Sequence, residues 1–186
     1  MLSHNSLAAL GLICLAMVAV AAAKPTLIKE KSKIEFVGSK PSASHKGGFK
    51  NFNVGGNVDW DDLTKSSLEI EIDATSLWSD DGGLTSHLKN RDFFNVEKFP
   101  KIQFDATNIK ISKDGEALVG GKLTLLDQAT EMSIPCKFDI TEEGLIVSTK
   151  FTIDRTKWGM SYGQGRVNNE VDISVTLVFA TPPGSA

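Results

Sequence analysis

The chain has 186 residues, of which 41% are hydrophobic, and its 20 basic and 23 acidic side chains give a net charge of −3. It contains no basic run, which argues against a nucleic acid as its partner. Cys136 is the only cysteine after the N-terminal segment that contains Cys14, so an internal disulfide is excluded for a chain without that segment and stability must come from packing.

Residues 1–23 have the layout of a secretory signal peptide. An apolar run from residue 7 to residue 20 ends in Ala21-Ala22-Ala23, just before Lys24, the first Lys or Arg of the chain. The run of about 14 residues is shorter than the roughly 20 that span a bilayer. We therefore expect cleavage near Ala23, export to the periplasm or beyond, one domain over residues 24–186 and no stable membrane insertion. An uncleaved anchor and a lipid anchor on Cys14 are the alternatives.

Apolar residues alternate with polar ones from residue 31 onward, which predicts strands. Turn sequences at Lys113-Asp114-Gly115 and Glu142-Glu143-Gly144 separate strands as hairpins require. Short connections between consecutive strands favour a single all-β domain, an up-and-down antiparallel barrel of eight strands. The eight expected strands are 32–38, 48–60 with a bend at Gly55-Gly56, 68–73, 102–107, 116–126, 134–139, 145–154 and 171–179.

One stretch, residues 79–98, interrupts this alternation. Its apolar spacing predicts a short helical segment near residues 84–94 that lies across one end of the barrel. The apolar faces of the strands either fill the interior or line a ligand cavity. The pattern alone does not choose between a filled and a hollow barrel.

Several segments resemble the YceI-like family of exported lipid-binding proteins. The longest is residues 87–104, HLKNRDFFNVEKFPKIQF; residues 151–160, FTIDRTKWGM, residues 121–125, GKLTL, and the weaker 48–52, GFKNF, add to it. The resemblance implies a lipocalin-like eight-stranded barrel whose hydrophobic tunnel holds a polyisoprenoid or another amphiphilic lipid, with no settled enzymatic activity. The chain departs from the family pattern at Leu84-Thr85-Ser86 and in the insert 78–83. Both lie near the expected mouth of the barrel, so the head-group preference is the family property that transfers least to this chain.

On this resemblance we predict eleven ligand-binding residues. Five phenylalanines supply apolar surface, Phe93 and Phe94 form a plug or a lid, and the remaining four lie near the mouth. Arg155 pairs either with an anionic head group or with a carboxylate that fixes the turn. Trp158 and Tyr162 either stack on the ligand or cover the barrel end. The full set is Phe36, Phe49, Phe52, His87, Phe93, Phe94, Phe104, Phe151, Arg155, Trp158 and Tyr162.

The sequence offers little support for catalysis. No nucleophile motif accompanies His87, so we predict no catalytic residue. His87 and His45 are too few for a zinc site without carboxylates, which Asp80, Asp81 and Asp92 could supply. Their spacing resembles no calcium loop, and we predict no metal and no cofactor apart from a bound lipid. Cys136 shares a face with Ile134 and Phe138, which predicts a buried thiol. The main hypothesis is a lipid carrier; an enzyme acting on an isoprenoid or quinone head group and a filled, ligand-free envelope stress protein are the alternatives. The oligomeric state stays open, a homodimer included.

Overall fold

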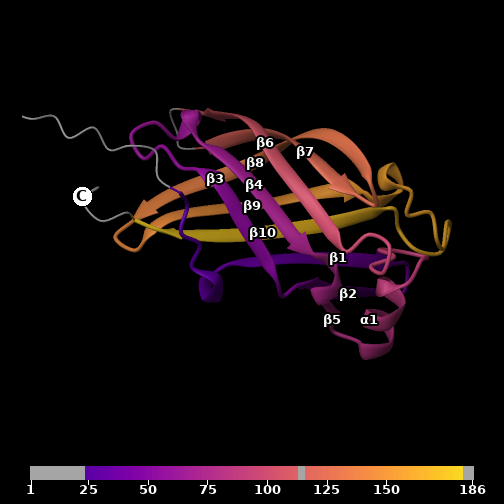
Figure 1. The fold of residues 1–186 in the computed structure, drawn as a ribbon. Coiled ribbons are helices and arrows are strands. Elements are labelled where there is room, and N and C mark those ends of the chain that lie inside the picture. Colours follow the sequence, from indigo (N-terminus) through magenta and orange to yellow (C-terminus); the bar gives the residue numbers. More distant parts are fainter. Residues whose placement is uncertain (1–23, 113–115, 182–186) are drawn as a thin grey trace, which may run out of the picture.

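The structure is a computed structural model that describes residues 24–112 and 116–181. The predicted signal peptide and the expected turn at 113–115 lie outside the described residues. A single antiparallel sheet dominates the rest and curls around a common interior (Figure 1). Its strands are β1 (Lys33–Lys40), β2 (Ala43–Phe49), β3 (Phe52–Asn57), β4 (Ser67–Asp73), β5 (Leu77–Ser79), β6 (Lys101–Ile111), β7 (Glu116–Leu125), β8 (Gln128–Thr141), β9 (Gly144–Asp154) and β10 (Glu170–Ala180).

The strand order is β3-β4-β6-β7-β8-β9-β10-β1-β2-β5. β3 and β2 stand near opposite ends of this order, yet only Lys50 and Asn51 separate them in the chain. Lys50 N–H donates to Ser76 O at 3.3 Å and Asp73 N–H donates to Asn51 O at 3.0 Å, which bonds this bend to the segment between β4 and β5. The chain itself therefore joins the two sides of the sheet into a barrel.

The predicted all-β antiparallel barrel is confirmed, but the predicted number of strands is wrong: the described residues form ten strands. The expected strand 48–60 is two strands, which break at Lys50-Asn51 and not at Gly55-Gly56. Phe49 and Phe52 are both buried although they are three residues apart, which strict alternation forbids, so the strand must bend between them. The short strand β5 pairs with β2 and was not predicted.

The expected helical segment forms α1 (Gly82–Lys89), followed by turns that reach β6. Asp81 caps the helix, since its carboxylate accepts a hydrogen bond from Leu84 N–H at 2.6 Å. α1 lies beside β5 at one end of the barrel (Figure 1). Three-residue or four-residue 3-10 turns also form at Lys29–Lys31, Leu63–Lys65, Ala74–Ser76 and Arg155–Trp158.

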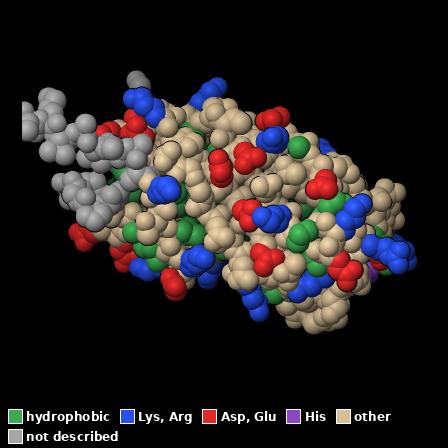
Figure 2. Space-filling view, in the orientation of Figure 1, with side chains coloured by type: hydrophobic (Ala, Val, Ile, Leu, Met, Phe, Trp, Pro, Cys, Tyr) green, Lys and Arg blue, Asp and Glu red, His purple; other side chains and the backbone are tan. Residues whose placement is uncertain are grey.

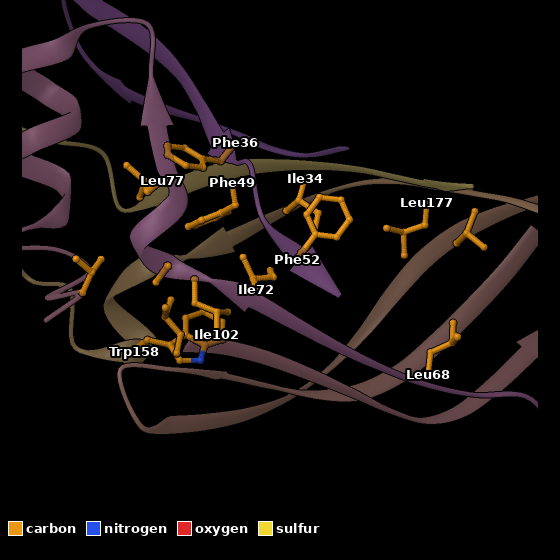
Figure 3. Close-up of a cluster of buried hydrophobic side chains, with 14 of the residues drawn as sticks. Ile34, Phe36, Phe49, Phe52, Leu68, Ile72, Leu77, Ile102, Trp158 and Leu177 are labelled. Carbon is orange, nitrogen blue, oxygen red and sulfur yellow. The ribbon is translucent and has the colours of Figure 1, made fainter. Parts of the chain in front are cut away.

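The hydrophobic core lies inside the barrel. Phe36, Phe49 and Leu77 gather near α1, whereas Leu68 and Leu177 project from opposite walls farther along the barrel (Figure 3). At the end away from α1, Val58, Leu145 and Phe179 are at most 3% exposed and close the interior by packing.

Candidate functional site

The middle of the barrel is hollow and encloses a cavity of about 550 Å³. Pockets that hold small-molecule ligands commonly have volumes of about 300–1,000 Å³. The predicted apolar faces of the strands line this cavity. Examples are Ile70 on β4, Phe104 on β6, Cys136 on β8, Phe151 on β9 and Ile173 on β10. Alternation therefore predicted the walls of the cavity, although it did not predict that the barrel is hollow.

Two glycines explain how large aromatic side chains can face inward without filling the space. Gly47 is directly opposite Phe36, and a Cβ at Gly47 would collide with the Phe36 ring. A Cβ at Gly121 would lie 2.5 Å from Cζ of Phe104 on the neighbouring strand. Each ring therefore lies close over a glycine of the adjacent strand, where no side chain opposes it. Rings placed against their own wall leave the axis of the barrel free.

Polar and charged side chains that line the cavity concentrate at its α1 end. Lys40 and His45 come from the β1–β2 hairpin, Asp81 and His87 from the α1 segment, and Arg155 from the end of β9. Lys40 and Arg155 carry positive charge at neutral pH, against one negative charge from Asp81. The cavity is thus apolar along its length and cationic at one end.

Arg155 is 4% exposed and holds the loop that follows β9. Its Nε donates to Asn168 O at 3.0 Å, its Nη1 to Met160 O at 2.5 Å and its Nη2 to Val167 O at 3.3 Å. Burial lowers the pKa of Arg155 below its usual value. No carboxylate of the described residues lies within ion-pair distance of Arg155, so backbone carbonyls take the place of the carboxylate considered above.

His87, Phe93 and Tyr162 form an aromatic group over the α1 end, called the mouth cluster below. The imidazole of His87 stacks edge to face with Phe93 and Tyr162, with ring centroids 5.2 and 5.0 Å apart, and the Phe93 and Tyr162 rings are 5.2 Å apart. Nε2 of His87 is 3.1 Å from Oδ2 of Asp92. The mouth cluster therefore connects the α1 segment to the loop that Arg155 holds.

Phe94 has a different position from its neighbour Phe93. Its ring lies 6.3 Å from Phe36 and 5.7 Å from Phe49, and these two rings are 6.0 Å apart. All three line the cavity. Phe94 thus packs on the wall below the mouth, whereas Phe93 belongs to the cover.

Nine of the eleven predicted residues line the cavity, and Phe52 and Trp158 do not. Phe52 is buried in the core (Figure 3), and Trp158 donates its Nε1–H to Leu123 O at 3.1 Å. That any of the eleven binds a ligand stays a prediction.

Sequence reasoning missed the pairing of His45 with Asp80, whose Nδ1 and Oδ1 are 2.9 Å apart. The backbone N–H of Lys46 also donates to Asp80, and these contacts hold the pKa of Asp80 below its usual value. Sequence reasoning also missed the pairing of His87 with Asp92. Neither pair has a recognisable spacing, because each depends on how a loop folds back on the chain.

In residues 24–112 and 116–181 no three His, Cys, Asp or Glu side chains gather closely enough to hold a metal ion. None of the described helices has the length and apolar character to cross a membrane. Acidic and basic side chains are interspersed over the face seen in Figure 2, which shows no large patch of one sign.

Comparison with known proteins places this fold in a family. The family description of the YceI-like domain matches residues 26–179. A UPF0312 protein of Pseudomonas putida is 36% identical over 81 residues, which are 42% of this chain and 41% of the relative, so the match spans less than half of that protein. A UPF0312 protein of Staphylococcus aureus strain USA300 is 28% identical over 72% of this chain and 80% of its own length.

Two solved structures share the fold. BcnA of Burkholderia cenocepacia superposes with a TM-score of 0.77 at 23% identity, over 83% of this chain and 99% of that one. A polyisoprenoid binding domain from Saccharophagus degradans, implicated in plant cell wall breakdown, superposes with a TM-score of 0.68 at 13% identity, over 87% and 99% of the two chains.

Proposed function

Because this chain belongs to the YceI-like family, we propose that it is an exported lipid-binding protein that transports, stores or sequesters its ligand and catalyses no reaction. The ligand is a long-chain polyisoprenoid or a similar amphiphile held in the cavity. The observation that carries the proposal is the cavity of about 550 Å³ with apolar walls and a cationic end. The polyisoprenoid binding domain with the same fold supports the ligand class, and the pattern of residues 1–23 supports export.

The energetics favour an apolar chain. Each CH₂ group moved from water to the cavity contributes about 0.8 kcal/mol, so a dozen carbons contribute roughly 10 kcal/mol. Association costs about 4–15 kcal/mol in lost freedom, so the chain has to be long before it binds tightly. This requirement favours polyisoprenoids over short fatty acids.

The head group lies at the α1 end, near Lys40, His45, His87 and Arg155 in this proposal. The positive balance of these residues favours an anionic or strongly polar group, such as a phosphate. Asp81 is engaged as the cap of α1, which leaves its charge partly compensated by the helix N-terminus.

The test is extraction of the purified protein with organic solvent followed by mass spectrometry, together with thermal unfolding of the delipidated protein with added prenyl alcohol or prenyl phosphate. We expect a co-purified lipid and a raised Tm, because a ligand at a hundredfold its Kd stabilises the folded state by about 2.7 kcal/mol. A lipid-free extract together with an unchanged Tm would contradict the proposal.

The pairing of His87 with Asp92 is the observation that favours an enzyme, since a carboxylate orients the imidazole as in acid–base catalysis. The variant His87→Ala separates the two functions. For a carrier it changes only lipid affinity and exchange, whereas for an enzyme it abolishes turnover of the co-purified lipid while leaving binding intact.

A further inference from the structure

The barrel wall is split between β8 and β9. These strands pair only from Thr141–Gly144 to Lys137–Ser148, close to their shared hairpin. Farther along, β8 stays paired with β7 as far as Gln128, and β9 stays paired with β10 as far as Asp154. Residues 128–136 of β8 and 149–154 of β9, all of them within the described part of the chain, therefore share no backbone ladder. The two strands can be followed from their hairpin in Figure 1.

Pro135 explains where the ladder stops. Its carbonyl oxygen accepts a hydrogen bond from Oγ1 of Thr149 on β9 at 2.5 Å, so this oxygen points toward β9. In an extended strand the N and O atoms of one residue lie on the same side, so the Pro135 nitrogen also faces β9. Proline has no N–H to donate there, which ends the pairing with β9. The pairing of Pro135 with Leu118 on β7 is unaffected.

A second cavity of about 350 Å³ lies over this split. Its outer rim includes Lys150 and Ser174, and its floor includes Cys136, Thr149 and Val175. The same three floor residues line the central cavity. A single layer of side chains therefore separates the outside from the apolar interior at this point, which we call the lateral window.

We propose that the lateral window is the route by which the apolar chain of the ligand enters and leaves the barrel, with the Thr149–Pro135 hydrogen bond as its latch. This inference rests on the proposed lipid-binding function. The packed residues Val58, Leu145 and Phe179 close one end of the barrel, and the mouth cluster covers the other. At the window, the Thr149–Pro135 side-chain hydrogen bond stands where a backbone ladder would otherwise join β8 to β9, so the wall can part there without breaking a ladder.

Stopped-flow exchange of a fluorescent prenyl probe tests the route. In Pro135→Val a backbone N–H again faces β9, and we expect uptake and release of the probe to slow by roughly tenfold while its Kd stays nearly constant. Thr149→Val removes the latch and should accelerate both rates. Lys110→Val changes an exposed side chain on β6 where the ladder with β7 is intact, so it is the matched control and should leave the rates unchanged.

Cys136 gives a second readout that needs no lipid. Its thiol, predicted to be buried, is only partly buried and lies on the window floor, so opening of the window should speed its reaction with a neutral maleimide. Burial raises the pKa of Cys136 to about 11, and the Thr149 hydroxyl partly opposes this rise. Loss of that hydroxyl raises the pKa of Cys136 and lowers its thiolate fraction, which by itself would slow labelling. Faster labelling of Thr149→Val therefore reports easier access of the maleimide to the thiol. We expect faster labelling in Thr149→Val and slower labelling in Pro135→Val.

The outcomes separate the two proposals. A probe that binds but exchanges at the same rate in both window variants, and faster in Tyr162→Ala, would assign the route to the mouth cluster and overturn the lateral window alone. A probe that fails to bind the unaltered protein would contradict the lipid-binding function. Labelling of Cys136 that is equal in all variants would overturn the window whatever binds.

Discussion

Replacement of Arg155 by methionine tests whether this buried cation holds the loop that covers the cavity. The change removes three hydrogen bonds, to the carbonyls of Met160, Val167 and Asn168, while keeping most of the side-chain volume. Each bond contributes about 1–2 kcal/mol after exchange with water, so the loss of three bonds should lower the free energy of unfolding by about 3–6 kcal/mol. That is a large share of the roughly 5–15 kcal/mol that stabilises a typical domain. Arg155→Lys keeps the charge but should lose most of the same stability, because one ammonium group cannot reach three separated carbonyls.

Urea unfolding of the delipidated protein, followed by tryptophan fluorescence, measures the effect. Arg166→Met is the control, since Arg166 is an exposed arginine of the same loop and its loss should change the free energy of unfolding by less than about 0.5 kcal/mol. Equal stability of the two methionine variants would refute the clamp. If Arg155→Met then weakens the binding of prenyl phosphate more than the binding of prenyl alcohol, each relative to the unaltered protein, Arg155 acts on the head group instead.

Three further changes probe the turns, the hollow interior and the acidic caps. Gly144→Ala should destabilise by about 1–3 kcal/mol in thermal unfolding, because φ is +132° and the new Cβ would overlap Phe179 O, whereas Gly82→Ala, with open space around its Cβ, should be nearly neutral. Gly121→Ala should push the Phe104 ring toward the axis and weaken binding of a prenyl probe by tenfold or more, roughly 1.4 kcal/mol, as read by titration. Hydrogen bonds from Thr75 and Thr156 hold the pKa values of Asp73 and Asp154 below the usual 3.8. The stability that these carboxylates provide is therefore complete well above the unfolded pKa and is lost as pH falls through the lowered pKa values, so Asp154→Asn should flatten this acid limb of a pH-dependent unfolding curve.

Much of the fold could be predicted because it depends on local patterns. The alternation in residues 102–106 and 171–179 assigns each side chain to a face without knowledge of the partner strand, and those faces do line the cavity. The break between Phe49 and Phe52 was missed because it depends on which neighbours the two halves pair with: β2 pairs with β1 and β3 with β4. Pairing of distant strands leaves no mark in a window of ten residues.

The site was less predictable, for a physical reason that Phe104 illustrates. Its ladder partner on β7 is Leu123. Whether its ring fills the interior or lies along the wall nevertheless depends on Gly121, two residues before that partner, and local sequence does not reveal this contact. His87 shows the same limit, since its contact with Tyr162 joins two loops that the sequence does not relate. Residue types at the site could be named from the resemblance, but their arrangement required the folded chain.

The hollow interior lowers the stability of the folded protein, and this loss bears on function. Closed, dry cavities created in protein cores cost about 24 cal/mol per Å³, so for about 550 Å³ this rate sets an upper limit of roughly 13 kcal/mol, which is comparable with the whole stability of many domains. Water at the polar end lowers this cost, but water gains little against apolar side chains such as Val119 and Ile173, which offer no hydrogen bond. Side chains at Gly47 and Gly121 would push the Phe36 and Phe104 rings into this space, yet both positions hold glycine. A barrel that keeps so costly a void, walled by apolar side chains and polar at one end only, has the structure that an amphiphilic chain would complete.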